Sequence, residues 1–400
     1  MSEQLKEQLV SWRRDFHQHP ETGYEEFRTS TIVARHLESL GLEVTTQVGK
    51  TGVVGLLRGE APGPTIGLRA DMDALPIQDL KKDVSYASQI NGKGHLCGHD
   101  AHTSMLMGAA QLLTGLGRPQ RGNIKFIFQP AEEGLAGAKA MMDDGVLQNP
   151  QVDAIAGIHV YPGLPTGAIG GSKGIAFASA DPIEITIFGK GGHAARPHEG
   201  VDAIAVSAQV ITALQNVTSR MIDPLEPAVV TIGKIEGGDI GTAIASTVRM
   251  VGTVRTLSPA VRDQMPVLIE QVIQGVTRSF GAQYELIYDK SYPAVRNNEG
   301  MVDFVTETSQ RLYGKEVWRD LKPSTGGEDF AFYSEAVPGV FFRLGVGDGE
   351  ERTSYPLHHP LFDLDENALQ HGTALLSAIA LRFLAEADES WLAGLQALQK

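Results

Sequence analysis

The sequence predicts an α/β fold, in which a central, mostly parallel sheet alternates with helices and is interrupted by a smaller inserted α+β domain. Three observations lead to this prediction. Up to residue 180, short apolar runs alternate with segments of helical spacing, which is typical of parallel sheets. Between residues 181 and 290, strands of alternating polarity and two long helices replace that pattern. From residue 291 the first pattern resumes, and 400 residues suffice for two or three domains.

The α/β part is expected to begin with two helices and to continue as strands separated by helices. Leu5, Leu9, Trp12 and Phe16 recur at helical spacing. A second helix over 24–40 ends before Gly41, because glycine readily adopts the left-handed conformation that closes helices. Further strands are expected at 53–57, 66–68, 124–128 and 154–159, and further helices at 101–113, 133–142 and 366–387.

The inserted part is expected to form a self-contained α+β module. Its strands are predicted at 183–188, 229–235, 247–255 and 284–288, and its helices at 202–220 and 259–280. Two helices over a small antiparallel sheet can bury a core of their own. The predicted organisation is therefore a discontinuous domain, residues 1–180 and 291–400, with an inserted domain, residues 181–290.

Composition and charge exclude several classes of function. With 34 Lys and Arg against 48 Asp and Glu, the net charge is −14, which repels phosphate backbones and anionic lipids. We therefore expect no nucleic-acid and no membrane partner. The single cysteine, Cys97, cannot form an intrachain disulfide. The N-terminus is polar, and the apolar run 373–385 is too short to span a bilayer, so a cytoplasmic location is expected.

Four short segments carry side chains suited to metal binding, each at the end of a predicted strand or in a loop. They are Cys97-Gly-His99-Asp100-Ala-His102, Gln129-Pro-Ala-Glu132-Glu133, Gly157-Ile-His159 and Leu357-His358-His359. Thiolate, imidazole and carboxylate are the ligands of zinc-like metals. Alternate side chains of extended backbone share a face, so Cys97 and His99 are expected to point at one centre. Glu132 and Glu133 are neighbours and are expected to point apart, one toward a metal and the other toward a bound water.

The residues alone leave a metal site and a structural polar cluster open as interpretations, because a buried cysteine or a lone histidine is more often structural. Two other patterns fail on context. Gly170-Gly-Ser172-Lys-Gly174 matches the nucleophile elbow of serine hydrolases, but no helix is predicted after it. Gly49-Lys50-Thr51 resembles the end of a phosphate-binding loop, but Val44 stands where the first glycine is required.

Eight stretches between residues 12 and 369 carry a resemblance that covers nearly the whole chain. They are WRRDFHQHPETGYEEF, LRADMDALPI, HLCGHDAHTSMLMGAA, IFQPAEEGLAGAKAMM, GIHV, GKGGHAARPHEGVDAI, GGEDFAFY and PLHHPLFDLDENAL. Together they resemble the M20 family of metallopeptidases and amidohydrolases, in the branch of hippurate hydrolases, N-acyl-amino-acid amidohydrolases and indole-acetyl-amino-acid hydrolases. The combination of CGHDAHT with FQPAEEG is highly specific. The resemblance implies a metal-binding catalytic domain and an inserted ferredoxin-like domain that acts in dimerisation and as a lid.

The resemblance also implies roles for single residues and a centre of two divalent ions, which could be Mn, Zn, Co or Ni. The metal ligands that it implies are Cys97, His99, Glu133, His159 and His358. Glu132 stands where the family has its general base and acid. His193 stands where the family has a histidine of the inserted domain, which reaches the active site of the partner subunit and stabilises the oxyanion. A homodimer or higher homo-oligomer is thereby implied.

Other positions have supporting roles or depart from the family. Asp73 matches a position that supports a metal-side group, and Asp100 is a weaker candidate of the same kind, whereas His102 and His359 are not expected to be ligands.

Many relatives carry a stretch like GGTAFNVIPDSV in the inserted domain. Here Thr242 replaces the usual Asn and Ala245 replaces the Pro. That Asn commonly helps bind substrate across the dimer, so the substitution leaves the substrate preference open.

The activity implied is hydrolysis of the amide bond of small N-acyl amino acids, hippurate-like or related, by a metal-bound water with Glu132 as general base. Arg255, Arg296 and Arg343 are candidates to bind the substrate carboxylate, and the sequence does not choose between them. The alternatives on the same fold are a p-aminobenzoyl-glutamate hydrolase and a dipeptidase or carboxypeptidase. A non-catalytic protein that binds a carboxylated ligand is the alternative from another class.

Overall fold

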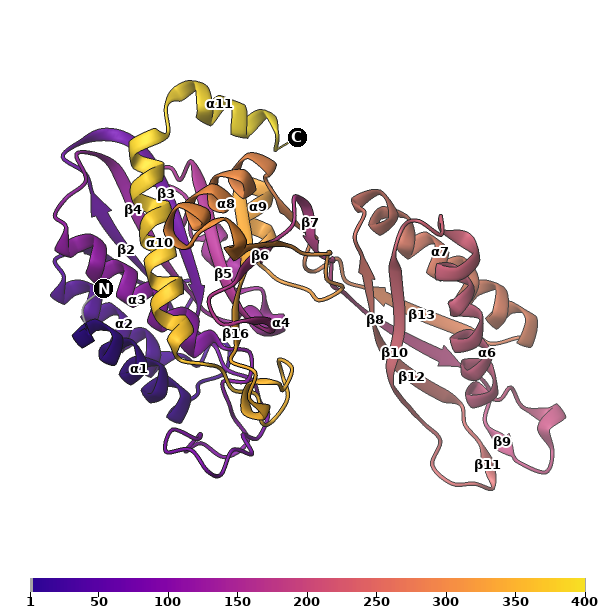
Figure 1. Cartoon of the computed structure of the whole chain (residues 1–400). Coiled ribbons are helices and arrows are strands. Elements are labelled where there is room, and N and C mark those ends of the chain that lie inside the picture. Colours follow the sequence, from indigo (N-terminus) through magenta and orange to yellow (C-terminus); the bar gives the residue numbers. More distant parts are fainter. Residues whose placement is uncertain (1–2, 400) are drawn as a thin grey trace. The chain divides into compact units, whose positions relative to one another are not determined.

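The structure, a computed structural model, describes residues 3–399 and comprises two compact units (Figure 1). Unit 1 contains the residues up to 176, residues 296–322 and the residues from 329 onward. Unit 2 contains residues 177–295 and 323–328. Residues 1 and 400, the outer bounds of the predicted domains, lie outside the described residues.

An eight-stranded sheet lies at the centre of unit 1, in the order β1-β2-β4-β3-β5-β16-β6-β15. Its strands are β1 (Glu43–Val48), β2 (Gly52–Arg58), β3 (Ala61–Asp71), β4 (Arg121–Gln129), β5 (Ala154–Pro165), β6 (Ile169–Gly171), β15 (Trp318–Asp320) and β16 (Gly339–Gly347). The four central strands β4, β3, β5 and β16 run parallel. β1, β2 and β6 add antiparallel pairs. The predicted α/β fold with a mostly parallel sheet is therefore confirmed.

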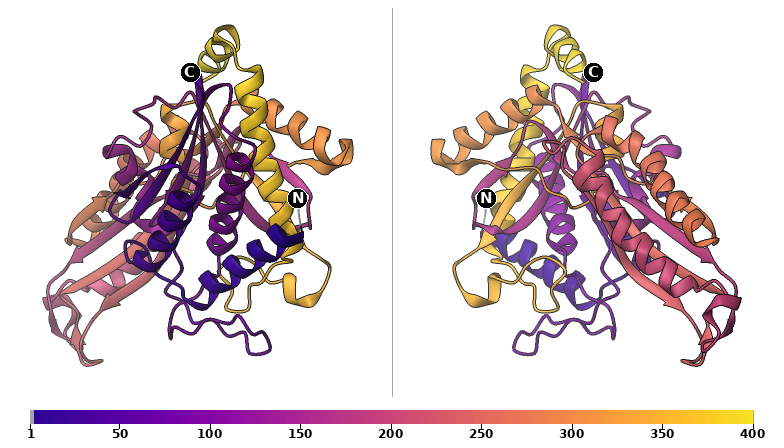
Figure 2. Two further views of the ribbon diagram at one scale, coloured as in Figure 1. Left: turned by 90° about the vertical axis from the view of Figure 1, so that its left-hand side faces the viewer. Right: turned by 90° about the vertical axis from the view of Figure 1, so that its right-hand side faces the viewer.

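Helices cover the sheet, and three of them form a layer of neighbours. α1, α3 and α10 contact one another, and α3 and α10 pack against β3 (Figure 2, left). The helices of unit 1 are α1 (Glu3–Gln18), α2 (Phe27–Ser39), α3 (His99–Gly115), α4 (Glu132–Leu135), α5 (Gly137–Asp143), α8 (Glu299–Tyr313), α9 (Ala331–Ala336), α10 (Asn367–Glu386) and α11 (Glu389–Ala397). Because both faces of the central strands are covered, β3 is buried continuously from Pro64 to Asp71.

Helix α10 is longer than the apolar run that marked it in the sequence. Its 20 residues make it the one described helix that is long and apolar enough to cross a membrane, by length and composition only. However, 61% of its apolar window is buried against the rest of unit 1. Packing against α3 and β3 accounts for its apolar composition.

Unit 2 has the β-α-β-β-α-β order of a ferredoxin-like module, with its four strands in the order β10-β12-β8-β13 and all pairs antiparallel. Its elements are β8 (Asp181–Phe188), β9 (Gly192–His193), α6 (Ala203–Asn216), β10 (Ala228–Gly237), β11 (Ala243–Ile244), β12 (Thr247–Thr256), α7 (Pro259–Phe280) and β13 (Gln283–Tyr288). Ile183, Ile185 and Ile187 alternate with more exposed residues on β8. These isoleucines pack with Val210 of α6 and Ile269 of α7 in one buried core.

The remaining elements are short. They are β7 (Gly174–Phe177), β14 (Val295–Asn297), and the helical turns η1 (Pro197–Glu199), η2 (Val217–Met221), η3 (Lys315–Val317) and η4 (Glu351–Thr353). Ser172 lies between β6 and β7 with no helix after it, so the structural context of a nucleophile elbow is absent there.

One predicted helix is interrupted. The segment 133–142 was expected to be a single helix, but α4 and α5 are separated by Ala136, which has φ +56°. Gly134, with φ +81°, also leaves the helical conformation. These positive φ values end each helical turn, and they place the residues after β4 in a loop with a strongly bent backbone.

Candidate metal centre

Side chains with metal-binding atoms gather at one edge of the unit 1 sheet. Asp73 follows β3, Glu132 and Glu133 follow β4, and His159 lies on β5. The loop after β16 carries His358. Because these four strands are parallel, their carboxyl ends meet at the same edge, where ligands of α/β sheets bind.

A tight turn at Gly98 brings Cys97 and His99 together. Gly98 has φ +89°, and a Cβ there would lie 2.3 Å from Cγ2 of Val160, so only glycine fits. The turn lets α3 begin at His99 directly after Cys97. The two side chains do share one region, but the expected reason, an extended backbone, was wrong.

Cys97, His99 and His159 form a buried cluster in which the donor atoms all lie within 4.8 Å of one another. Sγ of Cys97 is 3.5 Å from Nε2 of His159. The Nδ1–H of His159 donates to the carbonyl oxygen of Val160 at 2.7 Å. That hydrogen bond leaves the lone pair of Nε2 directed at the cluster.

Asp73 fixes two members of the site at once. Its Oδ1 lies 3.2 Å from Nδ1 of His99, and its Oδ2 accepts the backbone N–H of Glu133 at 3.0 Å. With Nδ1 engaged, Nε2 of His99 is left buried with no hydrogen-bond partner. Asp73 therefore orients an imidazole and the loop that carries the glutamates, as a carboxylate beside a metal ligand commonly does.

The two glutamates converge, contrary to the expectation that neighbours point apart. One carboxylate oxygen of each lies within 4.8 Å of the same nitrogen of His99. Glu133 has non-helical ψ of 76° between Ala131, with φ +54°, and Gly134. This bend turns the second carboxylate back toward the first. Glu133 also joins Cys97 and His358 in a further cluster, with its Oε1 3.2 Å from Nε2 of His358.

Burial and carboxylates set the charge of the site. Burial, followed by the charges of Glu133 and Glu132, raises the pKa of the Cys97 thiol well above its usual value. Burial lowers the pKa of His99, but Asp71 and Asp73 outweigh it and raise that pKa to about 10. Negative charge therefore exceeds positive charge in the cluster, which favours a bound cation.

The donor set fits divalent metal ions. The thiol of Cys97, two imidazoles and carboxylates converge, and one buried donor atom, Nε2 of His99, has no hydrogen-bond partner. An unpaired buried polar atom is costly, and a coordinated cation would satisfy it. The residues that could hold metal ions are Cys97, His99, Glu133, His159 and His358, grouped in clusters that share Cys97.

Asp71 is a central residue to which the sequence analysis assigned no role. Its Oδ1 lies 2.6 Å from Nδ1 of His102, and its Oδ2 accepts from Arg69 at 2.6 Å. Burial would raise the pKa of Asp71, but His99 and Arg69 hold it well below its usual value. The available signal was an acidic residue at the end of an apolar strand, two positions before Asp73.

His102 and His359 are not in the donor clusters that contain Cys97, and both have other partners. Nε2 of His102 accepts the N–H of Val160 at 2.9 Å, so both of its ring nitrogens are engaged. His359 stacks on Tyr355, and its Nδ1 accepts the N–H of Leu361 at 3.1 Å.

Asp100 belongs to a second buried network rather than to the donor clusters. Its Oδ2 lies 2.9 Å from Nε of Arg13 and 2.6 Å from Nδ1 of His17. Arg13 extends the network to Oδ1 of Asp363 at 3.0 Å. This network therefore connects α1, the start of α3 and the segment before α10.

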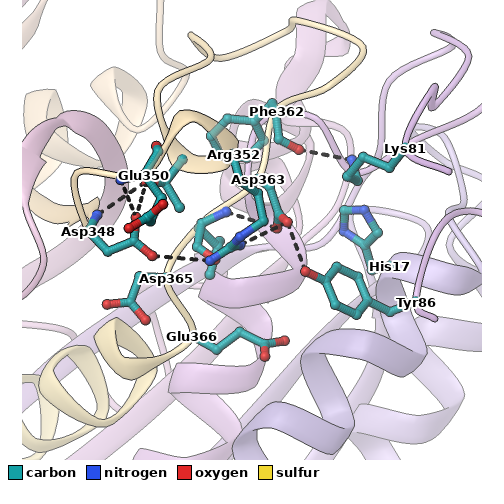
Figure 3. Close-up of polar contacts among 12 residues, drawn as sticks. His17, Lys81, Tyr86, Asp348, Glu350, Arg352, Phe362, Asp363, Asp365 and Glu366 are labelled. Carbon is teal, nitrogen blue, oxygen red and sulfur yellow. Dashed lines mark hydrogen bonds and ion pairs between the residues drawn. The ribbon is translucent and has the colours of Figure 1, made fainter. Parts of the chain in front are cut away.

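The same network fixes the loop that carries His358. Asp363 accepts hydrogen bonds from the hydroxyl of Tyr86 at 2.8 Å and from Arg352 at 2.9 Å (Figure 3). Lys81 donates to the carbonyl oxygen of Phe362 at 2.9 Å. The contacts of Tyr86 and Lys81 could not be predicted from the sequence, because their partners lie 277 and 281 positions away in the chain.

His193 lies in unit 2, on the short strand β9, and is exposed. It pairs with Ala243 of β11, and the N–H of the next residue, Ala194, donates to the carbonyl oxygen of Thr242 at 3.1 Å. Nδ1 of His193 accepts the N–H of Ala195 at 3.1 Å, which leaves Nε2 as the donor in the neutral ring.

The three candidate arginines lie in different surroundings. Arg255 is on β12 of unit 2, and Arg296 is an exposed residue of β14. Arg343 is on β16, in register with His159 of β5, and its guanidinium lies 4.5 Å from the ring centre of Tyr161.

We predict that Asp73→Ala weakens binding of divalent metal by about 10–100-fold, because His99 and the Glu133 loop lose their common acceptor. The dissociation constant is measured by competition with a chromophoric chelator. Asp153→Ala is the matched control, since Asp153 also accepts a backbone N–H, that of Thr65 at 2.8 Å, but before β5. Equal metal affinity in Asp73→Ala and the wild type would contradict the assigned role.

Comparison with known proteins gives a family. Residues 67–382 match the model of peptidase family M20/M25/M40. The chain is 42% identical over 385 residues to the probable hydrolase sll0100 of Synechocystis sp., covering 96% of this chain and 97% of that protein. It is 40% identical over 375 residues to an N-acetylcysteine deacetylase of Bacillus subtilis, covering 93% and 96%.

A solved structure has the same fold. The YXEP protein of Bacillus subtilis, described as a dinuclear metal binding peptidase of the M20 family, superposes with a TM-score of 0.82 at 36% identity, covering 96% of this chain and 100% of that one. The donor clusters at the sheet edge are consistent with such a centre. From its sequence and its fold, the chain belongs to peptidase family M20/M25/M40 and is a metal-dependent hydrolase of amide bonds.

Proposed function

We propose that the chain cleaves the amide bond of N-acyl amino acids, hippurate-like or related. The observation that carries the proposal is the convergence of Glu132 and Glu133 beside the donor clusters. One carboxylate is thereby available as a ligand while its neighbour remains available to accept a proton. The N-acetylcysteine deacetylase at 40% identity supports an N-acyl amino acid as the substrate class.

We propose that the residues Cys97, His99, Glu133, His159 and His358 hold two divalent ions, Mn, Zn, Co or Ni. The chemistry that such ions supply when bound is Lewis acidity, which lowers the pKa of water and polarises a carbonyl oxygen. Asp73 orients the ligand residue His99, whereas Asp71 pairs with His102, which is not a proposed ligand.

Glu132 is the general base and acid of the proposed reaction. It is 6% exposed, and its Oε1 lies 3.4 Å from the backbone nitrogen of Asp329, which donates to it. From this position Glu132 accepts a proton from the attacking water and later delivers it to the leaving amine.

His193 is the proposed donor to the oxyanion that develops on the amide carbonyl, and it acts from the partner subunit. Its Nε2–H is the free donor of the ring. Such donors are worth about 3 kcal/mol or more in acyl transfer. Thr242 directly precedes Ala243, the β11 residue that pairs with His193 of β9, so its replacement of the family Asn bears on substrate preference.

The proposed reaction also implies the partners and the location of the chain. They are a small N-acyl amino acid as substrate and a second copy of the chain in a homodimer or higher homo-oligomer, and the proposed location is the cytoplasm. The net charge of −14 disfavours nucleic acid and anionic lipid as partners. An anionic substrate must approach against that charge, which makes bound cations and an arginine at the site a requirement.

We predict that removal of divalent metal by a chelator abolishes hydrolysis and that added Mn, Co, Ni or Zn restores it, because the proposed reaction needs the Lewis acidity of the bound ions. The measurement is turnover of hippurate and N-acetyl amino acids beside dipeptides and p-aminobenzoyl-glutamate. Faster cleavage of the last two would favour the alternative substrates. Binding of carboxylated ligands without turnover under every metal would instead support a non-catalytic role.

We predict that Glu132→Ala and Glu132→Gln lower kcat by about 10²–10⁴-fold while the metal content stays unchanged, because only the proton acceptor is removed. Initial rates on hippurate and metal analysis of the purified variants measure both quantities. A fully active variant that retains its metal would refute the mechanism.

We predict that mixing inactive His193→Ala with inactive Glu132→Ala restores part of the activity, because a hybrid dimer contains one site with both residues intact. Each variant incubated with itself is the control. If native mass spectrometry detects hybrids and no activity returns, His193 acts within its own subunit.

A further inference from the structure

The stretch from Trp12 to Phe27 carried part of the family resemblance, yet none of its residues has a role in the proposed mechanism. Its last part, residues 21–26, lies against the two loops that hold the acidic residues of the site. The carbonyl oxygen of Glu21 accepts the N–H of Ala74 at 2.8 Å, directly after Asp73. The hydroxyl of Tyr24 donates to the carbonyl oxygen of Leu135 at 3.0 Å.

Gly23 brings this segment into close contact with the glutamate loop. A Cβ at Gly23 would lie 3.1 Å from Cα of Ala131 and 2.9 Å from Cδ1 of Leu135. Side chains larger than hydrogen would therefore push the segment away from the loop. The 21–26 segment is thus fitted to the backbone on both sides of Glu132 and Glu133.

Glu26 makes the central contact of this segment. It is fully buried, its Oε1 accepts the N–H of Ala131 at 2.8 Å, and its Oε2 accepts the hydroxyl of Thr51 at 2.5 Å. No ion pair to Glu26 is found among residues 3–399. Burial raises the pKa of Glu26 to about 7, and the charge of Asp73 adds to the effect. The carboxyl group of Glu26 is thus buried without a cationic partner among residues 3–399.

Glu26 accepts a hydrogen bond from the backbone N–H of Ala131, and the conformation of Ala131 sets the direction of the Glu132 and Glu133 side chains. Ala131 has φ +54°, a left-handed conformation that is unfavourable for alanine. Glu132 follows directly, and the bend at Glu133 and Gly134 comes next. A backbone held against its preference needs contacts that fix it, and the bond to Glu26 is one of them.

We propose that Glu26 is a positioning residue, which fixes the Ala131 amide and so aims the carboxylates of Glu132 and Glu133. The proposal deepens the proposed function and rests on it for the role of Glu132. Glu26 belongs to none of the donor clusters and acts through the backbone of the 131–134 loop.

The test compares variants that remove different parts of this contact. Glu26→Met keeps the volume and removes the acceptor, so we expect kcat on an N-acyl amino acid to fall about 10–100-fold with KM near the wild-type value. The dissociation constant for Mn is expected to rise about 10-fold, because Glu133 is on the same loop. Glu26→Gln keeps an oxygen for the Ala131 amide, so it should retain most of kcat and of the metal affinity.

Thr51→Val is the matched control, because it removes the other hydrogen bond of Glu26 and leaves the Ala131 contact intact. It should lower the melting temperature but keep kcat and metal affinity. Wild-type values in folded Glu26→Met, or an equal loss in Thr51→Val, would overturn the proposal.

Two further outcomes are separable. If Glu26→Met does not fold, Glu26→Asp replaces it, since the shorter side chain cannot reach both donors. A loss of kcat greater than that of Thr51→Val then supports the proposal, whereas an equal or smaller loss contradicts it.

If the wild type cleaves no N-acyl amino acid, the proposed function fails, whereas the Mn dissociation constants of the same variants still decide the role of Glu26.

Discussion

The concentration of carboxylates at one edge of the unit 1 sheet is the constraint on which the rest of that unit depends. Asp71 and Asp73 are nearly or fully buried, and Glu132 is only slightly exposed. Each has a specific partner: Arg69 and His102 for Asp71, His99 for Asp73, and the backbone of Asp329 for Glu132. Buried negative charge without such partners would oppose folding. The loops around the edge therefore have the conformations that supply these donors.

Much of this arrangement followed from the sequence, because strand ends and residue types are local features. Parallel strands meet at one edge, so the segments after β3 and β4 and the end of the predicted strand 154–159 were expected to come together, whereas β16 was not predicted. The chemistry of Cys97, His99 and Glu133 made a metal site one of two open interpretations, and the family resemblance favoured it. The assignment of these residues as ligands stays a prediction, as does the lid and dimerisation role of the inserted domain.

The other features of the site could not be predicted from the spacing of residues in the sequence. The turn at Gly98 replaces an extended strand, and a bend at Gly134 turns Glu133 back toward Glu132. Both depend on backbone conformations that only the packed structure selects. The contact between Arg13 and Asp363 joins residues 350 positions apart, and residue patterns contain no information on such pairings. The role of Asp71 was missed because its partner His102 comes from a helix rather than from a neighbouring strand.

The position of Cys97 has a thermodynamic consequence. Its sulfur belongs both to the cluster with His99 and His159 and to the cluster with Glu133 and His358. If the two proposed cations share this donor atom, they would not bind as independent sites, because the first would alter the charge and the orientation that the second meets. Occupancy of the proposed centre would then be a linked equilibrium, with a coupling free energy to which the shared thiol contributes.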